Sequence, residues 1–227
     1  MPRGQRDLAG IGMTSQRTRA RMVERLREQG IRDARVLDAM AGVPRHVFVD
    51  EALASRAYED TALPIGFRQT ISRPFVVARM IEQLASGREL GNTLEVGTGC
   101  GYQAAVLAQL AREVYSVERI RELLERARDN LRGLRLANLR LAHGDGWQGL
   151  ERAAPFDSII VAAAAAQVPD ALVRQLAMGG RMILPVRKAN AVAPDAQRLL
   201  LIERNALGCS QTELDPVRFV PMETGKI

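Results

Sequence analysis

The chain has little of the chemistry on which metal sites, disulfide scaffolds and membrane proteins depend. Its two cysteines, Cys100 and Cys209, and its two histidines, His46 and His143, have spacings that suit neither a zinc site nor a disulfide framework. No run of about 18 apolar residues occurs, which excludes a membrane-spanning helix. The charged N-terminus leads into no apolar segment of a secretory signal. We therefore expect a protein without a metal that works in the cytoplasm, where thiols stay reduced.

Aromatic residues are also scarce, at 4% of the chain, and the most basic segment contains none. The formal net charge is +6, and the first 35 residues hold nine arginines against four carboxylates. Proteins that bind single-stranded nucleic acid combine basic residues with aromatic rings on which the bases stack. Residues 17–32 instead mix arginine with acidic and apolar residues in a helical pattern. We therefore interpret this charge as a solvated helix face and expect no specific nucleic-acid partner.

The remaining pattern is that of an α/β protein. At 227 residues, with 47% hydrophobic and 26% charged residues, the chain has the composition of one soluble domain. From residue 93 onward, apolar runs of strand length alternate with helical patterns, which predicts a mostly parallel, doubly wound sheet with helices on both faces. The expected strands cover 93–97, 114–118, 139–143, 156–162 and 181–187, and the expected helices cover 102–111, 119–131 and 169–177. Helices over 17–29, 33–41 and 74–86 precede them as an N-terminal helical cap, and 198–202 with 217–220 predict an antiparallel C-terminal hairpin.

The most informative segment is a short apolar strand, residues 93–96, that leads into three glycines at alternate positions over 97–101 and then into a helix. Glycine is needed where the backbone turns tightly and lies against a ligand, and the following helix directs free N–H groups toward it. A dinucleotide fingerprint requires glycine or alanine at the sixth position, where this chain has Tyr102. The alternate glycines after an acidic residue, Glu95, are similar to motif I of the class I S-adenosylmethionine methyltransferases. A tight turn that binds no ligand is the structural alternative.

A second part of a nucleotide site is expected about 20 residues later, where a carboxylate at the end of the next strand accepts hydrogen bonds from ribose hydroxyls. Glu118 stands at that point, after the apolar run over residues 114–117. We interpret Glu118 as the ribose ligand, with an exposed strand-end carboxylate as the alternative.

Further motifs lie on both sides of this core, at residues 43–49 (VPRHVFV), 63–74 (LPIGFRQTISRP), 143–149 (HGDGWQG) and 216–222 (PVRFVPM). In this order and spacing, they resemble the protein-L-isoaspartate O-methyltransferase family from about residue 17 to the C-terminus. Gln-Thr-Ile-Ser before the glycine motif and His-Gly-Asp-Gly-Trp after the third strand are specific to this family. The resemblance implies a Rossmann-like class I methyltransferase fold. It also implies methyl transfer from S-adenosylmethionine to the free carboxylate of isoaspartyl residues in damaged proteins and peptides, with S-adenosylhomocysteine as the product.

The resemblance further implies roles for individual residues, with Ser72 as the catalytic residue. The methyl donor would contact Thr70, Ile71, Ser72, Glu95, Gly97, Gly99, Gly101, Glu118, Asp145 and Gly146. The substrate would lie along Ile65, Gly66, Thr70 and Val220. We expect residues 1–15 to be a flexible basic tail and residues 16–227 to form a single domain that acts as a monomer. Its expected parts are the cap and substrate segment (16–90), the donor-binding core (91–188) and the C-terminal hairpin (189–227).

The residues themselves leave the role of Ser72 open. Because a carboxylate with a pKa of about 4 is ionised at pH 7, methyl transfer to it needs alignment rather than a strong general base. Ser72 stands just before a helix that starts near Pro74, where a hydroxyl is able to donate to a carboxylate. The alternative is that Ser72 or Arg73 is only an N-cap, which is a common role before a proline-initiated helix.

The chain departs from the family pattern in two segments. Arg68 stands where glycine is common, and Ala162 and Ala166 stand where threonine and proline are usual. A nucleic-acid methyltransferase would share the glycine loop and Glu118, but the chain lacks the Asn/Asp-Pro-Pro-aromatic segment of amine methylation and a cysteine after proline for cytosine methylation. A binding module without enzyme activity is a further alternative, although Ser72 and both donor motifs are present.

Overall fold

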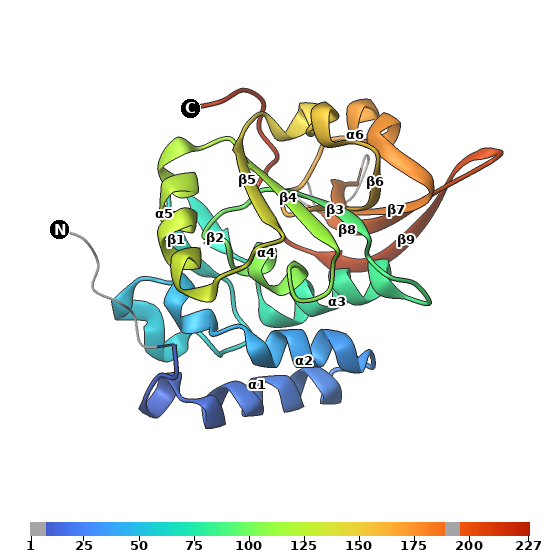
Figure 1. The fold of residues 1–227 in the computed structure, drawn as a ribbon. Coiled ribbons are helices and arrows are strands. Elements are labelled where there is room, and N and C mark those ends of the chain that lie inside the picture. Colours follow the sequence, from blue (N-terminus) through green and yellow to red (C-terminus); the bar gives the residue numbers. More distant parts are fainter. Residues whose placement is uncertain (1–7, 189–195) are drawn as a thin grey trace.

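The computed structural model describes residues 8–188 and 196–227. The strands of its main sheet are β3 (Asn92–Val96), β4 (Glu113–Glu118), β5 (Leu139–His143), β6 (Phe156–Val161), β7 (Leu176–Arg187), β8 (Gln197–Asn205) and β9 (Gly208–Val217). They lie in the order β5-β4-β3-β6-β7-β8-β9, parallel from β5 to β7 and antiparallel from β7 to β9 (Figure 1). A separate antiparallel hairpin consists of β1 (Leu63–Gly66) and β2 (Gln69–Ile71). The predicted doubly wound α/β fold with an antiparallel edge is confirmed.

Helices of two kinds surround this sheet. The α-helices are α1 (Gln16–Glu28), α2 (Ala34–Gly42), α3 (Pro74–Ala85), α4 (Tyr102–Leu107), α5 (Arg121–Leu131) and α6 (Asp170–Gln175). The short 3-10 helices are η1 (Gly12–Thr14), η2 (Arg45–Phe48), η3 (Glu51–Arg56), η4 (Arg132–Leu134), η5 (Gly146–Gln148) and η6 (Glu151–Ala153). In the two described ranges, every helix is too short or too polar to cross a membrane.

The central strands of the sheet are buried on both faces, because their successive side chains point to opposite sides and a hydrophobic core covers each side. Ile160 of β6 and Ile183 of β7 belong to the larger core, to which α1–α5 contribute. Their neighbours Ile159 and Met182 belong to a second core, which α6 covers. Because the side chains on both faces are mostly apolar, the central strands appear in the sequence as continuous apolar runs.

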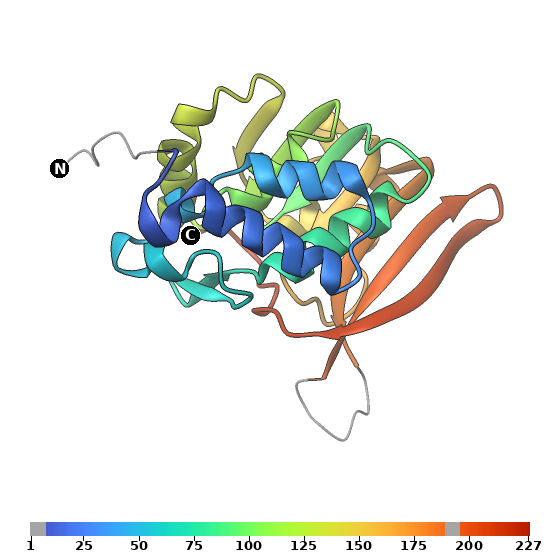
Figure 2. The ribbon, with the colours of Figure 1, turned by 90° about the horizontal axis from the view of Figure 1, so that it is seen from below.

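The N-terminal cap consists of α1 and α2, which pack on α3 (Figure 2). Met22 of α1 and Met40 of α2 are fully buried. Residues 8–15 lie against α1, where the Arg19 guanidinium donates a hydrogen bond of 3.3 Å to the Leu8 carbonyl. The first seven residues of the expected tail lie outside the described residues.

The structure corrects several predicted boundaries. The helix expected over 169–177 ends at Gln175, and the strand expected over 181–187 is β7, which already begins at Leu176. The second strand of the C-terminal hairpin is β9, over Gly208–Val217, and not residues 217–220. As an edge strand whose side chains are mostly exposed, β9 has no core to face and therefore lacks the apolar pattern on which the prediction relied. Helix α4 ends at Leu107 and not at 111, because the Asn138 amide donates to the carbonyls of Ala108 and Ala111, each at 3.0 Å, and satisfies them outside the helix.

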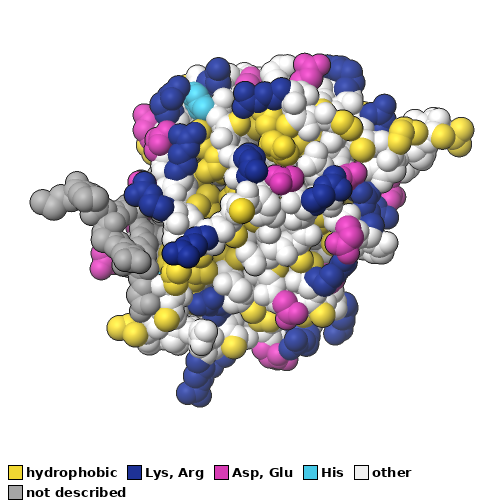
Figure 3. All heavy atoms as spheres, viewed as in Figure 1, with side chains coloured by type: hydrophobic (Ala, Val, Ile, Leu, Met, Phe, Trp, Pro, Cys, Tyr) yellow, Lys and Arg dark blue, Asp and Glu magenta, His cyan; other side chains and the backbone are white. Residues whose placement is uncertain are grey.

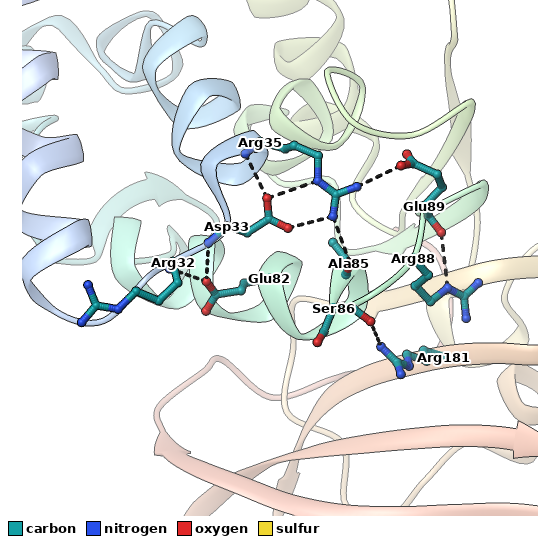
Figure 4. Close-up of polar contacts among 9 residues, drawn as sticks. All are labelled: Arg32, Asp33, Arg35, Glu82, Ala85, Ser86, Arg88, Glu89 and Arg181. Carbon is teal, nitrogen blue, oxygen red and sulfur yellow. Dashed lines mark hydrogen bonds and ion pairs between the residues drawn. The ribbon is translucent and has the colours of Figure 1, made fainter.

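One carboxylate joins the cap to α3. Glu82, which is 9% exposed, accepts hydrogen bonds from the backbone N–H groups of Arg32 at 2.6 Å and Asp33 at 2.9 Å, just before α2 (Figure 4). Asp33 is the N-cap of α2 and pairs with Arg35, which in turn reaches Glu89 at 2.9 Å. These hydrogen bonds fix the start of α2 on the surface of α3.

We expect Glu82→Ala to lower the free energy of unfolding by about 1–3 kcal/mol, because two backbone N–H groups lose their hydrogen bonds to a charged acceptor. Urea denaturation followed by circular dichroism measures this change. Glu24→Ala is the matched control, because Glu24 forms only an exposed pair with Arg27, and its loss should cost about 0.5 kcal/mol or less. Equal losses in the two variants would contradict the role of Glu82.

Candidate active site

A cavity lies at the carboxyl ends of β3 and β4, next to the point between β3 and β6 where the sheet reverses its strand order. In open α/β sheets this is the position at which ligands bind. Its walls are formed by the glycine loop after β3, the end of β4, the β1–β2 hairpin with the residues before α3, Gly146, residues 162–163 after β6, and residues 220–223. The predicted site residues that line it are Ile65, Thr70, Ile71, Ser72, Gly97, Gly99, Glu118, Gly146 and Val220.

The glycine loop needs backbone conformations that other residues adopt at a cost. Gly99 has a φ of +56°, and a Cβ there would lie 3.2 Å from the Ile65 side chain. Gly101 has a φ of +91°, and a Cβ there would lie 3.0 Å from Leu131 of α5. Gly99 lines the cavity, whereas Gly101 starts α4 and allows it to pack on α5. The loop therefore presents backbone to the cavity with no side chain in the way.

Glu118 connects the end of β4 to this loop. Its carboxylate accepts hydrogen bonds from the N–H of Gly99 at 2.8 Å and from the N–H of Ile120 at 3.0 Å. The residue is only 5% exposed, so the alternative of an exposed strand-end carboxylate is wrong. Each carboxylate oxygen can accept more than one hydrogen bond, which leaves acceptor capacity for ligand hydroxyls on the cavity side.

Glu95 lies behind the loop and does not line the cavity. Its carboxyl group accepts a hydrogen bond from the Ser116 hydroxyl, which also lies 2.6 Å from that of Thr98. Burial raises the pKa of Glu95 to about 8. The buried Gln103 amide lies beside this carboxyl group and favours its ionised form, which offsets part of the effect of burial on the pKa. Because Glu95 is fully buried and lies outside the cavity, it acts on the glycine loop from behind.

Asp145 binds backbone N–H groups of the protein, whereas the resemblance implies that it contacts the methyl donor. Its carboxylate accepts hydrogen bonds from the N–H groups of Trp147 at 2.9 Å and Gly225 at 2.7 Å, and the residue does not line the cavity. Gly146 does line the cavity, and a Cβ there would lie 2.4 Å from Val96. Asp145 therefore shapes the turn that brings Gly146 to the cavity and holds the C-terminal segment beside it.

Ser72 lines the cavity and is not the N-cap of α3. Arg73 has that position, and its side chain makes no cap hydrogen bond. The carboxylate of Asp60 accepts a hydrogen bond from the Phe75 N–H at 3.0 Å and takes the place of a cap side chain. Within the described ranges no hydrogen bond engages the Ser72 hydroxyl, so it is free to bind a ligand.

Arg45 supports Ser72 from behind, and sequence reasoning did not identify it. This fully buried guanidinium donates to the Ser72 carbonyl at 2.7 Å and to the Ala57 carbonyl at 2.8 Å, and it lies 4.8 Å from the ring centre of Tyr102. Burial lowers its pKa from the ordinary value for arginine. The signal in the sequence was a single cation within the apolar run of residues 43–49.

The C-terminal segment forms the remaining wall of the cavity. The Ala164 N–H donates to the Val220 carbonyl, and the Met222 N–H donates to the Ala164 carbonyl, both at 2.8 Å. Glu223 pairs with Arg119 at 3.0 Å, next to Glu118. Gly66 lies beside the lining residue Ile65 but does not itself line the cavity.

The predicted methyl donor fits this arrangement. A fixed carboxylate with spare acceptor capacity suits ribose hydroxyls, and an open glycine backbone suits close approach of a ligand. At the other end, Ser72 presents a free hydroxyl to a second ligand. The cavity can therefore hold a nucleoside-like molecule with its reactive end facing Ser72.

Comparisons with known proteins match this architecture over nearly the whole chain. A family model described as Protein-L-isoaspartate(D-aspartate) O-methyltransferase matches residues 17–226. The Protein-L-isoaspartate O-methyltransferase of Dechloromonas aromatica is 65% identical over 219 residues, which cover 96% of this chain and 99% of the relative. That of Aromatoleum aromaticum is 61% identical over 214 residues, which cover 94% and 95%.

A solved structure supports the same relationship. It is that of a protein-L-isoaspartate O-methyltransferase from Plasmodium falciparum in complex with S-adenosyl-L-homocysteine, with 26% identity and a TM-score of 0.78. The match covers 90% of this chain and 98% of that chain. The chain therefore belongs to the protein-L-isoaspartate(D-aspartate) O-methyltransferase family.

Proposed function

We propose that this protein is an S-adenosylmethionine-dependent carboxyl O-methyltransferase that methylates the free carboxylate of isoaspartyl residues in damaged proteins and peptides. One observation carries the proposal: a single cavity joins the glycine loop, the Glu118 carboxylate and the segment of Ser72. The family membership of the chain and the names of its relatives support the same activity. Methylation of isoaspartate activates it for return to aspartate, so the proposed role is protein repair.

The donor side of the proposed site is the sheet domain. Glu118 accepts hydrogen bonds from the ribose hydroxyls, and residues 97–101 lie against the methionine part. Gly146 borders the adenine, while Asp145 and Glu95 act from behind by holding the turn and the loop. When bound, S-adenosylmethionine supplies a methyl group activated by a sulfonium and leaves as neutral S-adenosylhomocysteine.

The acceptor side is the segment of Thr70, Ile71 and Ser72. The hydroxyl of Ser72 donates a hydrogen bond to the substrate carboxylate and orients it, and Arg45 keeps the backbone of Ser72 in place. No general base is needed, because the carboxylate, with a pKa of about 4, is already ionised. Alignment of the two reactants can supply roughly 7–11 kcal/mol of the reduction in the barrier.

Selection of isoaspartate over aspartate has to come from geometry. The two residues carry the same charge and differ only in where the peptide backbone leaves the residue. In the proposed complex, the substrate backbone lies along Ile65, Gly66, Thr70 and Val220. These residues are held in place from outside the cavity, since Arg126 donates to the Ile65 carbonyl and the Ala164 N–H donates to the Val220 carbonyl.

We further propose that the protein acts as a monomer in the cytoplasm without a specific nucleic-acid partner. Binding to nucleic acid favours a concentrated basic patch. On the face in Figure 3, basic side chains are instead scattered among acidic and apolar ones. This face therefore offers no concentrated basic patch to a nucleic acid.

The donor assignment predicts that Glu118→Ala weakens binding of S-adenosylmethionine by about 1.5–3 kcal/mol, because a hydrogen bond to a charged group contributes this much free energy. Isothermal titration calorimetry measures the change, after circular dichroism has established that the variant is folded. Glu122→Ala, which removes an exposed carboxylate from the first turn of α5, is the matched control and should bind normally. Unchanged affinity in folded Glu118→Ala would refute the assignment.

The acceptor assignment predicts that Ser72→Ala lowers kcat about 10- to 100-fold and changes donor affinity much less, since one hydrogen bond to an ionised carboxylate is lost. Steady-state kinetics with an isoaspartyl peptide, combined with donor titration, separates the two effects. Ser86→Ala, at the exposed end of α3, should keep kcat within about twofold. A kcat in Ser72→Ala equal to that of this control would exclude Ser72 from catalysis.

The proposed activity predicts transfer of labelled methyl groups to an isoaspartyl peptide, with a kcat/KM at least about 100-fold above that of the aspartyl peptide of the same sequence. A wrongly directed backbone leaves buried polar groups unpaired, at roughly 1–3 kcal/mol each. Transfer RNA serves as the acceptor that tests the rival activity. Similar kcat/KM values for the two peptides, or a better reaction with the RNA, would contradict the proposal.

A further inference from the structure

The turn between β1 and β2 has an unusual backbone for its sequence. Gly66 pairs with Gln69, so Phe67 and Arg68 are the two residues of the turn. Both have positive φ, +52° for Phe67 and +57° for Arg68. A two-residue hairpin turn with this geometry is usually Asn-Gly, because a large side chain is disfavoured at positive φ. The chain thus holds two large side chains where glycine would fit with less strain.

This turn lies at the edge of the active-site cavity. Ile65 on one strand and Gln69 and Thr70 on the other line the cavity, and the turn extends directly from them. Phe67 is 47% exposed, and Arg68 is exposed as well. A peptide whose isoaspartyl carboxylate reaches Ser72 therefore has its neighbouring residues close to this turn.

The charge of Arg68 is not neutralised by a neighbour. Other arginines around the cavity have carboxylate partners, Arg119 with Glu223 at 3.0 Å and Arg73 with Asp60 at 2.6 Å. Over residues 8–188 and 196–227, no hydrogen bond or ion pair engages the side chain of Arg68. An exposed, unpaired guanidinium attracts carboxylates, which it is able to bind through two hydrogen bonds, and repels other cations.

We propose, on the basis of the proposed function, that Arg68 is a specificity-determining residue that favours isoaspartyl sites flanked by acidic side chains. The guanidinium pairs with an Asp or Glu of the substrate next to the isoaspartyl residue. It disfavours substrates with Lys or Arg at the same position, so one side chain supplies both attraction and repulsion. Phe67 offers an apolar surface to all of these substrates alike.

The test uses three isoaspartyl peptides of equal length that carry Asp, Ser or Lys on both sides of the isoaspartyl residue. For the wild-type protein at low ionic strength, KM should be lowest for the Asp peptide and highest for the Lys peptide, with steps of about two- to fivefold. In 0.5 M NaCl the differences should largely disappear, because salt screens exposed charges. Arg68→Gly should abolish the order, with the effect in KM rather than kcat, and Arg68→Glu should reverse it.

Two controls separate recognition from structure. Arg68→Gly should leave the Tm unchanged or raise it by up to about 4 °C, because glycine relieves the strain of positive φ. Arg21→Gln removes an equal charge from the exposed side of α1 and should keep the wild-type order. The inference is overturned if Arg68→Gly retains the order, or if it raises KM equally for all peptides while Tm falls.

The proposed function and this inference fail in different ways. A wild-type protein that does not methylate the Ser peptide overturns the proposed function, and the role of Arg68 with it. A wild-type protein that methylates all three peptides with equal KM overturns only the role of Arg68.

Discussion

The guanidinium of Arg45 lies where the end of η3, the segment of Ser72 and the first helix after the glycine loop meet. It is fully buried, its Nε and Nη2 groups donate to the carbonyls of Ala57 and Ser72, and its central carbon lies 4.8 Å from the ring centre of Tyr102. Burying a cation is costly, and a site of this kind is stable only when hydrogen bonds and a ring offset the lost water. Any shift of these segments against one another would break the contacts of Arg45, so Arg45 fixes the acceptor half of the site to α4 in the donor half.

The carboxylate of Glu118 likewise holds two segments together, in this case within the sheet domain. It holds the N–H of Gly99 in the glycine loop and the N–H of Ile120 before α5, and it faces the cavity at the same time. The side chain proposed to bind the ribose is therefore also the one that holds the loop in shape. Such a site is organised before its ligand arrives, which reduces the entropy that binding has to overcome.

The two halves of the site come from parts of the fold with different constraints. The donor half is built on strand ends and the glycine loop, where backbone geometry leaves little freedom. The acceptor half is built on a two-stranded hairpin and on residues 220–223, which bridge to Ala164 beside the sheet. The choice of acceptor can therefore change through a surface residue such as Arg68 without disturbing the donor half. The choice of acceptor thus depends on the side chains at the site rather than on the fold.

The sequence by itself determined the sheet, the glycine loop and the position of Glu118. These features follow from short-range patterns, because residues a few positions apart decide strands, tight turns and strand ends. The edge strand β9 was misplaced for the same reason, since a strand with exposed faces carries no apolar pattern. Only the tertiary structure decided that Asp60 takes the capping role beside α3, which leaves the Ser72 hydroxyl free. It also decided that Arg45 supports Ser72, because these contacts join segments distant in the chain that nothing in the local pattern relates.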